Sequence, residues 1–379
     1  MEQALNKRER LGSVDGMRGI AALAVVLFHL GGALREPLAE ILPDWVMIAL
    51  SYGYLGVPIF FVISGLVISR NIKEGIDKRY AGMFILRRSL RLDPTYWAAI
   101  IIAISTTLAK SFLFDQPVNL PSVSGVLLHF VYLQDIFTVE PSISVVYWTL
   151  CLEVQFYLFF LLSKWACEKI STFLSRPAAF MHGSIILLVA CWSLAIDVKV
   201  IEFPWPGIFV RYWHYFYLGV LVSCCISRAP WARTIFTIWC VILIASQIAI
   251  TPLAYILAAL LSAIGFYSLW KLGLSNQVLV SKPLQFLGMI SYSLYLIHPD
   301  IGWKFISLNK AVLGENLTPW MALLIFLLAI MVSLFSALIL YRVVERPSLS
   351  ITNALRTKSP RILLQEWRTG SQDLKGAAG

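Results

Sequence analysis

The stretch 14–34 constrains the fold of this chain more than any other feature. It is apolar and long enough to cross a membrane, yet it contains two ionisable residues, Arg18 and His29. Ionisable groups inside a bilayer are costly and usually face a protein interior or a water-filled path. Eleven residues separate the two, which in a helix is about 16 Å of rise and three full turns. Both side chains are therefore predicted on one helix face, which indicates chemistry carried out within a membrane.

The composition is that of a polytopic membrane protein. Of the 379 residues, 59% are hydrophobic and 14% are charged, whereas a soluble domain carries about 25% charged residues. We predict an all-α bundle of about ten transmembrane helices, each near the ~20 residues needed to cross ~30 Å of hydrocarbon. The predicted spans are 14–34, 50–70, 93–113, 145–164, 183–199, 207–226, 233–250, 252–270, 284–306 and 318–341. The stretch 123–138 is apolar but short, and whether it spans the membrane, re-enters it or lies on its surface is left open.

Basic residues gather in the N-terminal segment, in the loops 70–91 and 164–182, and after residue 341. Ten spans put all these segments on one side, which places both termini in the cytoplasm because cytoplasmic loops collect Lys and Arg. The same bias accounts for the net charge of +10 without a nucleic-acid partner. We divide the chain into a transmembrane domain over 1–349 and a basic, disordered cytoplasmic tail over 350–379.

The cysteines give no sign of a disulfide or a metal site. None of the six forms a CxxC pair or lies with histidines at metal-ligand spacing. The sequence also lacks a phosphate-binding Walker loop, a GxSxG elbow and an HExxH motif. We therefore expect no metal and no permanently bound cofactor, and any group donor has to bind in another way.

Two of the polar clusters have a functional and a structural interpretation. His29 lies near mid-span and is a candidate proton acceptor, because imidazole titrates near neutral pH; the alternative is a histidine satisfied by a neighbouring helix, with Arg18 snorkelling to the surface. In a helix, Arg87, Arg88 and Arg91 point roughly one way. Guanidinium groups bind phosphate bidentately, so this cluster suits phosphate or pyrophosphate. The alternative is ordinary cytoplasmic charge in contact with lipid headgroups.

A carboxylate, Glu153, lies inside another predicted span, with Tyr157 one turn further on. A buried carboxylate has to be protonated, paired or hydrogen-bonded, and its candidate partners are His29, Arg18 and an arginine of the 87–91 cluster. Paired with His29, it would orient the imidazole as the acid of a hydrolase triad does. The alternative is a structural buried ion pair.

His298 shares a helical stripe with Ser291 and Tyr295 toward the outer end of its span. Histidine and tyrosine are common at membrane interfaces, so a structural role is the alternative there. Further on, Glu345 and Arg346 close the last span, and we expect Glu345 to form a salt bridge between helices.

Taken together, these motifs resemble the acyltransferase 3 family of integral membrane O-acyltransferases. They occur in the family's order over residues 11–347, as Asp15–Ala22 with His29, Phe60–Gly65, Arg88-x-x-Arg91 with Pro94 and Tyr96, Trp148–Leu150 with Glu153 and Tyr157, Ser291–Pro299, and Glu345–Pro347. The resemblance implies a ten-helix fold that moves an acyl group, usually acetyl, from cytoplasmic acyl-CoA to a hydroxyl, most often on a cell-surface glycan. It also implies that Arg18, His29, Arg88 and Arg91 are essential.

The residues and the resemblance combine in one hypothesis about the site. The catalytic residues are His29 as general base, Arg18 as the group that positions the donor or stabilises negative charge, and Glu153 as the orienting partner. A covalent acyl-enzyme through His29 is the other route. The substrate-binding residues are Arg87, Arg88 and Arg91 for CoA phosphates, together with Tyr96, Tyr157 and His298.

The expected partners are acyl-CoA, the lipid bilayer, proteins of glycan assembly and a carbohydrate acceptor. The acceptor is expected to be a polymer such as exopolysaccharide or lipopolysaccharide O-antigen, which can be linked to a lipid. The expected location is the bacterial inner membrane. Two alternatives stay open, an acyltransferase that modifies a small molecule or antibiotic, and a glycan or proton-coupled transporter. Binding of acyl-CoA separates the enzyme from the transporter.

Overall fold

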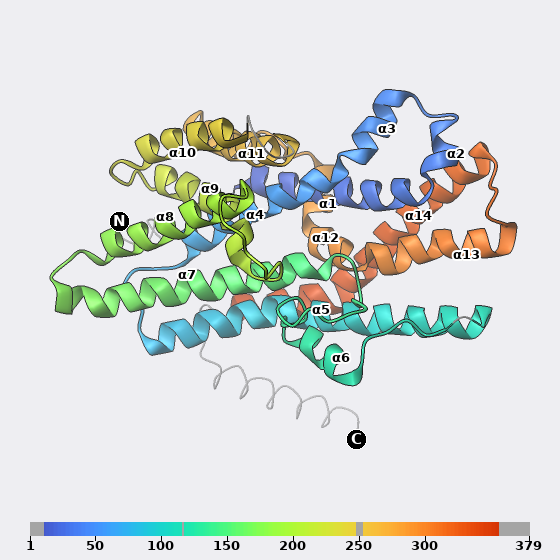
Figure 1. Cartoon of the computed structure of the whole chain (residues 1–379), viewed down its shortest axis with the longest axis horizontal. Coiled ribbons are helices and arrows are strands. Elements are labelled where there is room, and N and C mark those ends of the chain that lie inside the picture. The colour runs from blue at the N-terminus through green and yellow to red at the C-terminus, as the bar shows by residue number, and fades with distance from the viewer. Residues whose placement is uncertain (1–10, 116, 248–252, 356–379) are drawn as a thin grey trace, which may run out of the picture.

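The computed structural model describes residues 11–115, 117–247 and 253–355, and within these ranges the chain is helical without strands. Helices α1, α5, α7 and α8 run roughly along the longest axis of the molecule (Figure 1). The longer helices are α1 (Gly12–Ala33), α4 (Gly56–Asn71), α5 (Lys78–Phe114), α7 (Tyr147–Leu174), α8 (Ala178–Asp197), α9 (Trp213–Ile226), α10 (Ala232–Gln247), α11 (Leu253–Lys271), α12 (Lys282–His298) and α14 (Pro319–Leu340).

Short helical segments connect or extend these helices. They are α2 (Arg35–Ala39), α3 (Asp44–Ser51), η1 (Gly53–Leu55), α6 (Val123–Phe130), η2 (Phe209–Tyr212), η3 (Pro299–Trp303), α13 (Lys304–Leu313), η4 (Tyr341–Glu345) and α15 (Arg346–Ala354). Because α15 ends at Ala354, the helix enters the segment predicted to be a tail from residue 350. The rest of that predicted tail, residues 356–379, lies outside the described residues.

Eight helical segments of the described chain are long and apolar enough to cross a membrane, which confirms the all-α, multi-span fold. The other two predicted spans, 233–250 and 284–306, coincide with the shorter helices α10 and α12. The uncertain stretch 123–138 contains only α6, whose eight residues extend about 12 Å. Such a helix is too short to cross the bilayer. The cytoplasmic location of the termini stays a prediction.

Glycines let the central helices pack closely. A Cβ on Gly288 of α12 would overlap the carbonyl of Asp15 in α1, and a Cβ on Gly219 of α9 would overlap the carbonyl of Val62 in α4. Small residues at such crossings let two backbones approach, which is a main source of helix association within a bilayer. These contacts fix α12 against α1 and α9 against α4.

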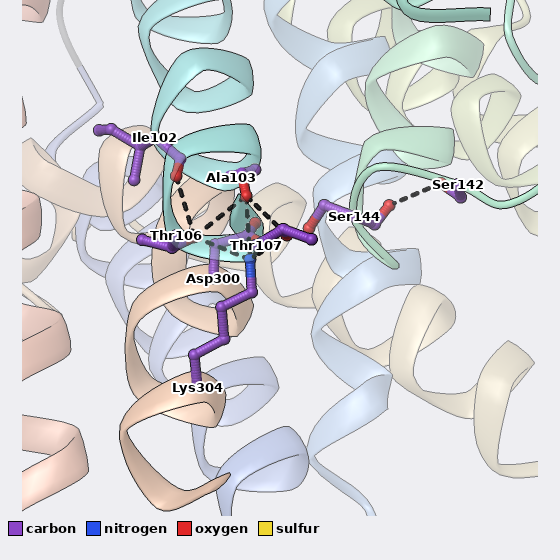
Figure 2. A network of polar contacts seen from close by, with 8 residues as sticks. All are labelled: Ile102, Ala103, Thr106, Thr107, Ser142, Ser144, Asp300 and Lys304. Atoms are coloured by element: carbon purple, nitrogen blue, oxygen red, sulfur yellow. Dashed lines mark hydrogen bonds and ion pairs between the residues drawn. The ribbon is translucent and has the colours of Figure 1, made fainter. Parts of the chain in front are cut away.

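Helix α12 continues past His298 into a π-helical turn, η3, and then into α13. Lys304 ties this region to α5 (Figure 2): its Nζ donates to the Ala103 carbonyl at 3.0 Å and to the hydroxyls of Thr106 and Thr107 at 2.7 Å each. The same ammonium forms an ion pair with Asp300 at 3.2 Å. The chain that follows His298 is therefore held in place relative to α5.

Candidate active site

Five of the predicted site residues meet in one cavity between the helices. Arg18 from α1, Arg88 and Arg91 from α5, and Glu153 and Tyr157 from α7 all line it. Its volume is about 90 Å³, which is room for about three water molecules at ~30 Å³ each. Three cations and a carboxylate thus come together inside an otherwise apolar bundle.

A second cavity, of about 520 Å³, adjoins the first on the side where the described part of the chain begins and ends, with Leu11 and Asn353 in its lining. Four residues line both cavities: Arg18, Val67, Arg91 and Glu345. The larger cavity is within the ~300–1,000 Å³ range of ligand-binding pockets. Together the two form a route that starts near the chain ends and leads inward past Arg18 and Arg91.

Glu153 is bound by two hydroxyl groups, and this corrects the expected pairing with His29 or an arginine. It accepts a hydrogen bond from Ser64 Oγ of α4 at 2.5 Å and another, on the same Oε1 atom, from the Tyr157 hydroxyl. Tyr157 lies one helical turn from Glu153, so their bond follows from helix geometry. Ser64 was missed as a site residue because its contact depends on how α4 is rotated against α7.

Arg88 lies over two aromatic rings at the cavity wall. Its guanidinium carbon is 4.8 Å from the centroid of the Tyr157 ring and 5.8 Å from that of Phe84. Both distances are within the range of a cation–π interaction, which holds the side chain without consuming its N–H donors. The donors therefore remain available to an anion in the cavity.

Three residues of the predicted substrate-binding set, Arg87, Tyr96 and His298, lie outside both cavities. Tyr96 is fully buried, with its ring stacked on Tyr132 at 4.7 Å and edge-on to Tyr147 at 5.0 Å. Five residues along α5 rotate its side chain by about 140° from that of Arg91. Tyr96 thus lies away from the cavity, and its contact with substrate stays a prediction.

Glu345 is a further carboxylate at the site, and it accepts a hydrogen bond from Ser293 Oγ at 2.6 Å. The expected salt bridge between helices is replaced by this bond, although Glu345 still interacts electrostatically with Arg18 and Arg91. It lines both cavities and is buried, so the arginines share their cavity wall with a second carboxyl group.

His29 lies beyond the inner end of the arginine-lined cavity rather than in its wall. Its ring centroid is 5.1 Å from that of His298 and 6.1 Å from that of Trp303. Tyr295 connects the two regions, because it lines the cavity and its ring centroid is 6.1 Å from that of His298. The structure thus brings His29 and His298 together, which the separate sequence motifs did not predict.

The Tyr295 hydroxyl is hydrogen-bonded to Thr149 Oγ1 at 2.9 Å. Thr149 directs its own proton to the carbonyl of Val146, also at 2.9 Å. A hydroxyl has a single proton to donate, so Tyr295 is the donor in the bond to Thr149. This places a donor O–H at the inner end of the cavity, between the arginines and the two histidines.

The described residues contain no group of three or more His, Cys, Asp or Glu side chains that could hold a metal ion. The side chains gathered at the site supply arginine cations, a phenol and two imidazoles. Such a set can bind an anion at one end and accept a proton at the other.

The chain belongs to the acyltransferase 3 family, since the family model, described as an acyltransferase domain, matches residues 11–342. A peptidoglycan O-acetyltransferase of Listeria monocytogenes serovar 1/2a is 25% identical over 166 residues, which are 40% of this chain and 24% of that protein. A protein of Acidianus two-tailed virus that is named as an acetyltransferase is 29% identical over 143 residues, which are 38% of each chain.

A Staphylococcus aureus (strain COL) protein named as an O-acetyltransferase is 27% identical over 168 residues, which are 41% of this chain and 24% of that protein. The chain thus spans less than half the length of each of these relatives. No solved structure matches it. The family match confirms the resemblance found in the sequence.

Proposed function

We propose that this chain transfers an acetyl group from cytoplasmic acetyl-CoA to a hydroxyl of a carbohydrate. The observation that carries the proposal is the arrangement of charge: Arg18, Arg88 and Arg91 line one cavity, and its inner end adjoins the buried His298 and its neighbour His29. Anion binding and proton acceptance are the two functions that transfer from a CoA thioester requires.

The donor enters through the larger cavity near the chain ends. CoA carries a pyrophosphate and a further phosphate, and arginine binds such groups with two parallel N–H donors. Arg18 and Arg91 line both cavities, so they face any phosphate that passes from one to the other. At about 90 Å³ the inner cavity is narrower than a pantetheine arm requires. Donor binding therefore includes a widening of this cavity, as in induced fit.

The transfer conserves atoms and protons without a cofactor. The acceptor oxygen forms a bond to the thioester carbonyl carbon, and His29 takes the hydroxyl proton as general base. The bond from carbon to sulfur then breaks, and the departing thiolate takes the proton from His29. The Arg18 guanidinium is the donor for the carbonyl oxygen while it carries negative charge, and the Tyr295 hydroxyl joins it by turning its proton from Thr149 to that oxygen.

The acceptor reaches His29 from the side opposite the arginines. Trp303 and Phe28 lie against His29, and aromatic rings are surfaces on which the apolar face of a sugar packs. The basic loops at the donor end favour a cytoplasmic location for that end. The acceptor would then meet the enzyme from the outer half of a bacterial inner membrane, where lipid-linked glycans and their assembly proteins occur.

Membranes that contain the protein and receive acetyl-CoA labelled in the acetyl group would test the proposal. We expect label in the glycan fraction with the wild type and none with His29→Gln. His214→Gln is the matched control, because His214 is also buried but is bonded to Ser193 away from the site. Equal labelling with His29→Gln and His214→Gln would contradict the role of His29. CoA binding without label would point to a different acyl group or acceptor, and no CoA binding would favour transport.

A further inference from the structure

The side chain of His298 is held in one protonation form by the turn that follows it. Its Nδ1 lies 2.9 Å from the Tyr295 carbonyl and 3.1 Å from the Leu294 carbonyl. Carbonyl oxygens only accept hydrogen bonds, so Nδ1 carries the proton and Nε2 is left with a lone pair. The tautomer of His298 therefore follows from its backbone contacts.

The next residue explains why these contacts exist. Residue 299 of a regular helix would donate its N–H to the carbonyl of Tyr295, four residues earlier. Pro299 has no N–H, so that carbonyl is free to accept from the histidine ring instead. Lys304 fixes the following turn against α5, as Figure 2 shows. The His-Pro sequence at the end of α12 thus fixes the orientation of the His298 imidazole ring.

The lone pair of His298 lies in the protein interior next to His29. His298 is fully buried, and its Nε2 has no hydrogen-bond partner among the described residues. The Nδ1 atom of His29 is also buried and also has no partner there. The ring centroids are 5.1 Å apart at an interplanar angle of 50°. The remaining rings that face His29 are Trp303 of η3 and Phe28 of α1, and neither is charged.

We propose that His298 is a positioning residue for His29: its Nε2 accepts the Nδ1–H of His29, which leaves His29 Nε2 free to act as the base. This inference rests on the proposed function, in which His29 takes a proton from the acceptor hydroxyl. The ring centroid separation of 5.1 Å is compatible with a hydrogen bond between the two unpartnered nitrogens. His298 then serves as a neutral counterpart of the carboxylate that orients histidine in hydrolase triads.

The arrangement also stabilises the charged intermediate form of His29. Once His29 has taken the hydroxyl proton, both of its ring nitrogens carry protons. Its Nδ1–H would be an unpaired charged donor in a buried site without the lone pair of His298. Because Glu153 is bound by Ser64 and Tyr157, this role does not fall to that carboxylate.

The first test measures the reaction, using purified full-length protein in lipid vesicles with labelled acetyl-CoA and the glycan acceptor. His298→Phe is expected to lower the plateau of kcat/KM about 10- to 100-fold, the value of one hydrogen bond to a charged group. The KM for acetyl-CoA should stay the same. The rising limb of the pH–rate profile should move to lower pH, because the protonated ring loses its partner.

Two further variants separate positioning from packing. His298→Gln retains an acceptor oxygen near the place of Nε2, and we expect it to recover most of the rate. His214→Phe removes an equally buried histidine elsewhere, and its pH–rate profile should match that of the wild type. A folded His298→Phe protein whose profile is unmoved, or a His298→Gln protein as impaired as His298→Phe, would overturn the proposal.

The second test does not depend on the reaction. The chain has five histidines, so ¹⁵N-histidine labelling and solid-state NMR can report the tautomer of each ring, with assignment by single substitution. We expect Nδ1–H for both His29 and His298 in the wild type, and a mixture of tautomers for His29 in His298→Phe. A wild-type His29 protonated on Nε2 would refute the inference. This readout holds even if the acetyl transfer itself is not observed.

Discussion

Arg91 gives the sharpest test of the donor site, because it lines both cavities and lies where they meet. Arg91→Gln keeps a polar side chain but removes the charge and the planar fork. A hydrogen bond to a charged group contributes about 1.5–3 kcal/mol. Loss of this guanidinium is therefore expected to weaken CoA binding about 10- to 150-fold. Arg91→Lys retains the charge without the bidentate geometry, so we expect an intermediate loss.

The assay is titration calorimetry of the detergent-solubilised protein with CoA at fixed ionic strength. Arg87→Gln is the matched control, because Arg87 lies one turn away on α5 and lines neither cavity. It should bind CoA within about twofold of the wild type. Higher salt should weaken CoA binding by the wild type more than by Arg91→Gln, because ions screen the Arg91 charge, which the variant lacks. Equal affinities of the Arg91→Gln and Arg87→Gln proteins would refute the placement of CoA phosphates in this cavity.

Three further predictions concern stability, turnover and pH. Gly288→Ala forces α12 away from α1 and should cost about 1–3 kcal/mol, read as a lower Tm, whereas Gly183→Ala, which meets nothing within 4 Å, should leave the Tm unchanged or raise it. Tyr295→Phe removes a donor and should lower kcat about tenfold without changing the KM for acetyl-CoA; an unchanged kcat would exclude contact with the reacting carbonyl. Burial raises the pKa of Asp135 from 3.8 to about 6, so the folded protein loses stability as the pH rises between these values. Asp135→Asn should therefore raise the Tm more at pH 7.5 than at pH 4, and equal shifts would contradict this.

Most of the arginine site could be predicted from the sequence because charge inside an apolar chain has few explanations. Arg18, Arg88, Arg91 and Glu153 stand out in their spans, and they do meet in one cavity. Tyr96 follows the arginines closely in sequence, but helical rotation turns its side chain toward the packed aromatic group around Tyr132, so it does not line the cavity. Nearness along a helix does not ensure a shared face.

The pairing of residues between helices could not be predicted. Ser64 reaches Glu153, and His298 reaches His29, only because close glycine contacts set the rotation and height of α4 and α12. Hydrophobic periodicity predicts which face of a helix is buried, but not which helix packs against that face. The predicted span 284–306 corresponds to α12, η3 and the start of α13, and hydropathy does not detect the change to a π-helical turn at Pro299.

The bond between Tyr295 and Thr149 matters for the electrical insulation of the membrane. A membrane keeps its potential only if its proteins contain no continuous water-filled path for ions. In the proposed function, the arginines hold the charged donor on one side of Tyr295, and the two histidines lie beyond it. The acyl group itself carries no charge. The proposed reaction would therefore move a covalent group through the bilayer interior while the membrane potential stays intact.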